Sequence, residues 1–284
     1  MKKTVCFLLA ILTVALTACN KIAPAASDEL PQAAYLIDEA IIDNICVSLQ
    51  KNGLHNVDVF KVWVKDFAGT SAEKTDLPKQ WVKLADLRGD TFACADRWEE
   101  THDYPDADCR MTAMLLMGDL LKVDRPKKSY DGTYLMMDVD AIENTDKYRM
   151  IQERETDFTT LFGEMPIPDA GIAQALPRNW EAHGISFNAK SASLISVVME
   201  DTMSPTAFVG HAGILLDEGD SLLFIEKLAF EQPYQVTRLR NTDELIKMLS
   251  ACPEYAAEDG KEPSVICRNN AVIGRIISEQ NAGC

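Results

Sequence analysis

Residues 206–228 decide the fold class, and they read TAFVGHAGILLDEGDSLLFIEKL. Two largely apolar runs, 206–216 and 221–230, flank a polar turn that contains glycine. Apolar runs of this length on either side of a polar turn are typical of a β-hairpin. Residues 194–199 and 234–239 have the same character, so the second half of the chain is predicted to form an antiparallel sheet.

His211 and Glu226 lie on the two arms of this hairpin. If the turn is centred between Glu218 and Gly219, the two side chains face each other with Cβ atoms about 5 Å apart. A carboxylate so placed orients an imidazole and stabilises its charged form. His211 is expected to share its strand face with Val209. A one-residue slip would separate the pair, and a buried pair without chemistry is the alternative interpretation.

The first half of the chain has the spacing of amphipathic helices. Helices are predicted over residues 35–50, 57–67, 154–162 and 172–183, and a later one, capped by Asn241, runs to residue 249. Runs of helices followed by runs of strands favour an α+β fold over an alternating α/β fold. We therefore predict an α+β domain with a helical first half.

Residues 105–121, PDADCRMTAMLLMGDLL, predict a buried helix that begins at Cys109. Asp108 is a good N-cap for this helix. The positive end of the helix dipole stabilises a thiolate in the first turn, where a cysteine nucleophile needs it. Asp106 and Asp108 oppose that effect. A structural thiol or half of a disulfide is the alternative interpretation of Cys109.

The N-terminus has the layout of a secretory signal, which we assign to residues 1–18. Its apolar run is too short for a comfortable transmembrane span. The stretch Leu16-Thr17-Ala18-Cys19 resembles the cleavage box of bacterial lipoproteins. That resemblance implies acylation of Cys19 and anchoring in the cell envelope, with sorting to the outer membrane. An ordinary secretory signal is the alternative.

Residues 19–33 are predicted to be the lipidated cysteine and a flexible tether, and residues 34–284 a single domain. The net charge of −16 repels nucleic acid, so the sequence argues against a protein that binds DNA or RNA. The acidic stretch 137–146 lacks the glycine and the terminal glutamate of a calcium loop, so it is interpreted as a helix start. Neither a metal site nor a cofactor is predicted.

Disulfide bonds are expected among the cysteines, because such bonds persist in exported proteins. Cys252 and Cys267 flank a polar loop and are the preferred disulfide pair, and Cys46 with Cys94 is a further pairing. Connectivity does not follow from sequence alone. The cysteines are at positions 6, 19, 46, 94, 109, 252, 267 and 284.

The start of the Cys109 helix and the His211 strand resemble the NlpC-type cell-wall cysteine peptidases. That family typically has Asp-Cys-Ser-Gly at a helix start and His-Val-Gly-Ile on a strand, where this chain has Asp-Cys-Arg-Met and His-Ala-Gly-Ile. The resemblance implies a papain-like fold with Cys109 as nucleophile, His211 as base and Glu226 as the residue that orients His211. The chain departs from the pattern at Arg110-Met111 and in a long insertion before His211.

Longer segments resemble an uncharacterised family of bacterial lipoproteins, known only as a domain of unknown function. They include residues 108–112, 193–197, 210–214, 223–227 and 232–235. This resemblance implies one homologous domain over nearly all of the mature chain. It implies no activity.

These patterns together predict an envelope cysteine hydrolase. It would be an amidase or peptidase that acts on peptidoglycan-like or N-acyl amide bonds. The backbone N–H of Cys109 is a candidate oxyanion donor, and Gln235 is a candidate donor or a polar support. The alternative is a non-catalytic surface lipoprotein that binds a partner. A disulfide-bonded Cys109, or a distant His211, would favour that alternative.

Overall fold

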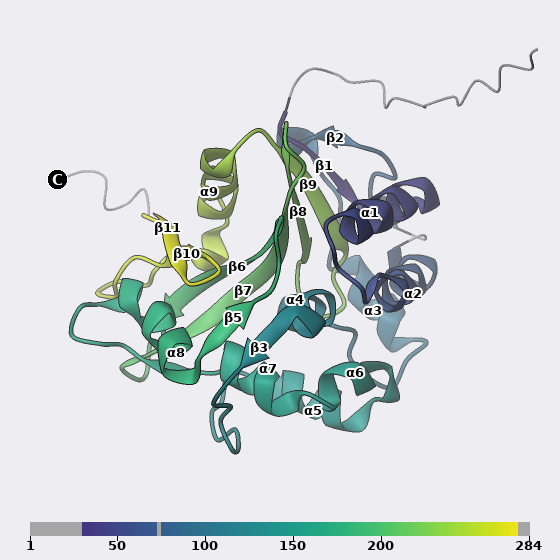
Figure 1. Ribbon diagram of the computed structural model, residues 1–284. Helices are drawn as coiled ribbons and strands as arrows, with labels where there is room; N and C mark the ends of the chain where they lie inside the picture. Colours follow the sequence, from purple (N-terminus) through teal and green to yellow (C-terminus); the bar gives the residue numbers. More distant parts are fainter. Residues whose placement is uncertain (1–29, 73–74, 278–284) are drawn as a thin grey trace, which may run out of the picture.

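The computed structural model describes residues 30–72 and 75–277 (Figure 1). The predicted signal peptide, Cys19 and most of the predicted tether lie outside these residues, as does Cys284. The first strand, β1 (Gln32–Tyr35), begins inside the segment predicted to be a tether. No helix in the described ranges is long and apolar enough to cross a membrane.

Helices dominate the described chain as far as His183, and strands dominate after it, with α9 as the exception. This order matches the predicted α+β class. The helices are α1 (Glu39–Lys51), α2 (Val57–Phe67), α3 (Ala93–Glu99), α4 (Cys109–Met117), α5 (Met136–Asn144), α6 (Arg149–Gln152), α7 (Glu155–Phe162), α8 (Ala175–His183) and α9 (Thr242–Ser250). The strands after β1 are β2 (Val82–Lys83), β3 (Leu121–Val123), β4 (Met165–Pro166), β5 (Ile185–Phe187), β6 (Ala192–Glu200), β7 (Thr206–Asp217), β8 (Leu222–Lys227), β9 (Tyr234–Leu239), β10 (Val265–Arg268) and β11 (Ala271–Arg275).

One large antiparallel sheet organises the fold, in the order β11-β10-β6-β7-β8-β9-β1-β2. Strand β4 pairs with the start of β7, and β3 and β5 form a small separate sheet. The sheet extends beyond the second half of the chain, because β1 and β2 from the helical half complete one side of it. These long-range pairings leave no local signal in the sequence.

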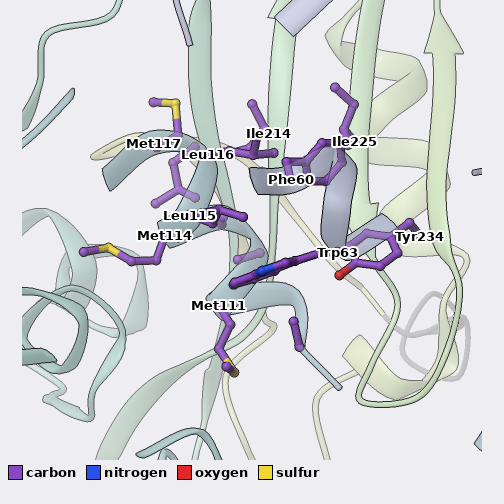
Figure 2. Packing of buried hydrophobic residues seen from close by; sticks show 14 of the residues in the cluster. Phe60, Trp63, Met111, Met114, Leu115, Leu116, Met117, Ile214, Ile225 and Tyr234 are labelled. Carbon is purple, nitrogen blue, oxygen red and sulfur yellow. The ribbon is translucent and has the colours of Figure 1, made fainter. Parts of the chain in front are cut away.

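Each face of the sheet carries its own apolar core. Helices α1, α2 and α4 cover one face, and their buried residues pack against β7, β8 and β9 (Figures 1 and 2). On the other face, Leu245 and Leu249 of α9 pack with Leu215 of β7. The sheet is therefore buried on both sides near its middle. Members of the larger core drawn in Figure 2 include Phe60, Trp63, Leu116, Ile214, Ile225 and Tyr234.

The N-cap residues predicted from the sequence mark the observed starts of α4 and α9. Asp108 Oδ1 accepts a hydrogen bond from the Met111 N–H at 2.8 Å, which fixes the start of α4 at Cys109 as predicted. Asn241 caps α9 in the same way. Helix α1 begins later than predicted, because Asp38 caps it and the residues before it form β1.

The predicted register of the β7–β8 hairpin is wrong by two residues. Glu226 faces Gly213, not His211. The reason is the turn, where the Glu218 N–H donates to the Ser221 carbonyl at 3.0 Å and Gly219 has φ +91°. Because side chains alternate with a period of two, a two-residue shift keeps His211 and Glu226 on the same face.

Core packing around α4 predicts a stability difference between two methionines. Met117 of α4 is 1% exposed, and Met137 of α5 is 64% exposed. We expect Met117→Ala to lower the free energy of unfolding by about 2–5 kcal/mol, because it leaves a cavity. Met137→Ala is the control and should change it by less than about 0.5 kcal/mol. Urea denaturation of both variants measures the difference, and equal effects would contradict this description of the core.

Candidate functional site

The sheet splits between β7 and β8, and the candidate site lies at this fork. Pairing between the two strands ends at Gly213 and Glu226. Beyond that point β7 continues to Thr206 beside β6, whereas β8 stays paired with β9. The first turn of α4 reaches the fork, where Arg110 Nη1 donates to the Val209 carbonyl at 3.2 Å. A helix start and two diverging strands therefore meet at one point.

A β-bulge at Gly210 aims the His211 side chain. Val197 of β6 pairs with His211, and the next residue of β6 pairs with Val209, so Gly210 is left without a partner in the ladder. A Cβ at Gly210 would collide with the sulfur of Met199. Val209 packs in the core with α4, whereas Val197 belongs to the core on the other face. The prediction that Val209 and His211 share a face is wrong, because the bulge inserts one extra residue.

Three buried polar side chains form a line of hydrogen bonds across β7, β8 and β9. His211 Nε2 lies 2.7 Å from Glu226 Oε2, and the Gln235 amide donates to Glu226 Oε1 at 3.1 Å. The same amide lies 3.4 Å from Thr237 Oγ1. Gln235 thus acts as polar support for the carboxylate, the second of the two roles predicted for it, rather than as a free oxyanion donor.

Cys109 and His211, far apart in sequence, meet at the fork. The two side chains lie close enough for Cys109 to contribute to the pKa of the imidazole. Nε2 of the ring contacts Glu226, so Nδ1 is the ring nitrogen not engaged by that carboxylate. Burial alone would lower the pKa of His211, but the negative charges and hydrogen bonds of Cys109 and Glu226 outweigh it and raise that pKa to about 10. The surroundings of His211 therefore favour the charged imidazolium.

The carboxylates before Cys109, expected to oppose a thiolate, are both paired with cations. Asp106 is fully buried between Lys227 Nζ at 3.0 Å and Lys147 Nζ at 2.9 Å. Burial raises the pKa of Asp106, but the two ammonium groups outweigh it and bring that pKa below its usual range. Asp108 lies 2.9 Å from the Arg110 guanidinium. Their negative charges are therefore largely compensated within the fold.

Tyr255 covers the site from the face that carries α9. Its ring lies 5.2 Å from the His211 ring, centroid to centroid, and the two planes differ by 26°. Burial, followed by the charge of Glu226, raises the pKa of Tyr255. Cys109 is 5% exposed, His211 2% and Glu226 4%, so all three residues of the site are buried. Sequence reasoning missed Tyr255, which ends a single-turn 3-10 helix (Pro253–Tyr255) with no motif of its own.

The predicted Cys252–Cys267 disulfide is absent. Cys267 lies in β10 within the core on the α4 side, whereas Cys252 follows α9 on the other face of the sheet. Burial raises the pKa of Cys252 to about 11, and nearby Glu226 adds to that effect. All five cysteines in the described ranges are free: Cys46, Cys94, Cys109, Cys252 and Cys267. Cys109 is thus available as a thiol.

The acidic side chains of the fold form no metal site in the described ranges, and one of them pairs with Arg110. Within residues 30–72 and 75–277, no cluster of three or more His, Cys, Asp or Glu side chains could hold a metal ion. Asp138, from the acidic stretch 137–146, is fully buried in α5 and accepts two hydrogen bonds from Arg110. The acidic helix start was predictable from the sequence, but this contact with the residue after Cys109 was not.

Because the pKa of His211 is raised in the fold, the stability of the protein should depend on pH through this residue. An unfolded histidine has a pKa of about 6.5, and His211 in the fold has a pKa of about 10. The stability it contributes is present in full below the unfolded pKa and is lost as pH rises through the folded pKa. His211→Gln should lower the free energy of unfolding, measured by urea denaturation. We expect this loss to decrease steadily as the pH rises from about 6.5 to about 10. His55→Gln, which alters a histidine side chain that is 71% exposed, is the control. A constant loss would contradict the buried cation.

Comparison with known proteins gives one match. The model of a family described as a domain of unknown function, DUF4300, covers residues 33–273. No curated protein and no solved structure matches the chain. The matched region includes all of β1 but its first residue, the start of α4 and the whole β6–β9 sheet, and so contains every residue of the candidate site. The chain therefore belongs to the DUF4300 family of domains of unknown function.

Proposed function

We propose that this protein is a cysteine hydrolase with a papain-like arrangement of its site. The observation that supports the proposal most strongly is the buried line from Cys109 through His211 to Glu226. Each member has a partner suited to its role: the helix start for the thiolate, the thiol and carboxylate for the imidazole, and Gln235 for the carboxylate. Neither condition expected for a binding module, a bridged Cys109 or a distant His211, is met.

Acylation follows from this geometry. The Cys109 thiolate attacks the carbonyl carbon of an amide and forms a C–S bond, and the carbonyl electron pair moves onto oxygen. The backbone N–H of Cys109 lies in the unpaired first turn of α4 and would donate to that oxyanion. The imidazolium of His211 gives its proton to the leaving nitrogen as the C–N bond breaks. An amine leaves and a thioester remains.

Deacylation reverses the proton transfer. Neutral His211 takes a proton from water, and the hydroxide attacks the thioester carbonyl. The C–S bond breaks, a carboxylic acid is released and the thiolate returns beside the imidazolium. Glu226 holds the ring in one orientation and one tautomer through both steps, because its 2.7 Å contact fixes Nε2.

The substrate class is inferred from where the protein is expected to act. If Cys19 is acylated, the domain faces envelope material, in which the amide bonds of peptidoglycan stem peptides are abundant. N-acyl amides are the second chemical class that the same steps would cleave. Anchoring in the outer membrane through Cys19 and a tether is part of the proposal.

Thiol labelling tests the proposed chemistry directly. Iodoacetamide should modify Cys109 of the folded domain well below pH 8.5, about where an ordinary thiol ionises, and His211→Ala should abolish this fast reaction. Cys267 is the internal control, since burial raises its pKa to about 12. Mass spectrometry identifies the modified residue. A Cys109 no more reactive than Cys267 would end the hydrolase proposal and favour a binding module.

Lipid anchoring has its own test. Cells given a labelled palmitate should incorporate it into the full-length chain and retain the protein in the membrane fraction. Cys19→Ser should lose both properties, because each buried acyl methylene contributes about 0.8 kcal/mol to membrane binding. Cys46→Ser, which changes a buried cysteine of α1, is the control. Unchanged incorporation in Cys19→Ser would contradict the proposed anchor.

A further inference from the structure

The residue after Cys109 makes an unusual set of contacts for one side chain. Arg110 Nε and Nη2 donate to the two carboxylate oxygens of Asp138, each at 2.8 Å. Nη2 also lies 2.9 Å from Asp108 Oδ2, and Nη1 donates to the Val209 carbonyl at 3.2 Å. The Arg110 side chain is 14% exposed and that of Asp138 is 0% exposed. This guanidinium is thus almost fully enclosed by partners.

Those partners come from three separate elements at the site. Asp108 caps α4, Asp138 lies in α5, and Val209 lies in β7 next to the bulge. Cys109 directly precedes Arg110, and His211 follows Val209 by two positions. A planar donor group with fixed geometry therefore joins the backbone that carries the thiol to the backbone that carries the imidazole.

The charge of Arg110 is also needed at this place. Two buried carboxylates, Asp108 and Asp138, lie against it. Burial and the neighbouring charge of Asp108 raise the pKa of Asp138 to about 7 even with Arg110 present. Cys109 in turn contributes to the raised pKa of Arg110, which places the thiol within range of the guanidinium charge. Without Arg110, Asp108 and Asp138 would lose the cation that pairs with both of them beside Cys109.

We propose that Arg110 is a positioning residue of the Cys109 site, which holds the α4 start against the bulged strand and supplies the positive charge that offsets Asp108 and Asp138. The inference rests on the proposed cysteine chemistry. It assigns a role in this chain to the position at which the NlpC-type pattern has serine. The simpler alternative is a structural ion pair whose loss affects stability alone.

The titratable groups around Cys109 define what a pH profile can report. They are Asp108 and Arg110 from α4, Asp138 from α5, His211 from β7, Glu226 from β8, and Cys252 and Tyr255 from the segment after α9. Arg110 and His211 are the cations of this set. Arg110 keeps its charge over the whole working range, so its removal shifts a labelling profile without adding a titration of its own.

Arg154 provides a matched control at the opposite end of α4. Its guanidinium binds Asp157 at 2.6 Å and donates to the Leu121 carbonyl at 3.0 Å and to the Gly118 carbonyl, so it too bridges a carboxylate and backbone oxygens. It lies beyond the helix C-terminus, away from Cys109. Arg154→Gln should therefore lower stability without altering the chemistry of the thiol.

The experiment measures the iodoacetamide reaction of Cys109 from pH 5 to 9 in the full chain, together with thermal unfolding. We expect Arg110→Gln to raise the midpoint of the profile by about one to two pH units and to slow labelling at pH 6 roughly tenfold or more. Arg110→Lys, which keeps the charge, should restore most of the midpoint. Arg154→Gln should leave the midpoint where it is in the wild type.

The outcomes separate this inference from the proposed function. Fast wild-type labelling with an unchanged midpoint in folded Arg110→Gln would overturn the positioning role and leave the hydrolase proposal standing. Slow wild-type labelling at acidic pH would overturn the hydrolase proposal itself. If Arg110→Gln fails to fold, the double variant with Asp138→Asn removes one of the stranded buried charges. A smaller upward shift is expected in it, because Asp108 alone is left without its cation, and no shift would overturn the inference.

Discussion

The end of the β7–β8 pairing at Gly213 and Glu226 is the constraint on which the site depends. Where two strands diverge, their facing N–H and C=O groups lose their partners and must find others. At this fork the Val209 carbonyl receives Arg110 from the helix start. The opening in the sheet thus admits the first turn of α4, and with it the thiol. A hairpin paired along its whole length would exclude the helix from the position where Cys109 meets His211.

Sequence reasoning succeeded where the signal is local. Asp108 and Asn241 announce the helices that they cap, and alternation along the strands put His211 and Glu226 on one face. That pairing survived a register error because the error was an even number of residues. Sequence reasoning failed where a contact joins distant segments. The bulge at Gly210 depends on the neighbouring strand, and the addition of β1 to β9 has no pattern of its own.

Buried charge is concentrated around the chain that enters α4. Asp106 lies between two lysines, and Lys227 is itself 0% exposed and stacked over the Phe67 ring at 3.8 Å. Such groups are costly to bury, and replacing them with apolar side chains is often neutral or stabilising in other proteins. Their value here lies in geometry. Both lysines bind Asp106, so they hold the loop that leads into α4 and the Cys109 backbone in one position.

If Cys109 is the proposed nucleophile, the burial of the site beneath the Tyr255 ring also bears on the chemical lifetime of the thiol. A thiolate in contact with peroxides passes through sulfenic acid to irreversible sulfinic and sulfonic acids. Because Cys109 is 5% exposed, an oxidant would reach it chiefly through local opening of the structure around it. The rate of inactivation is then the product of the open fraction and the intrinsic rate of oxidation. In the proposed hydrolase, a cover that opens rarely would slow turnover and damage by the same factor, so the number of substrate molecules processed before inactivation would be set by the thiolate itself and not by the cover.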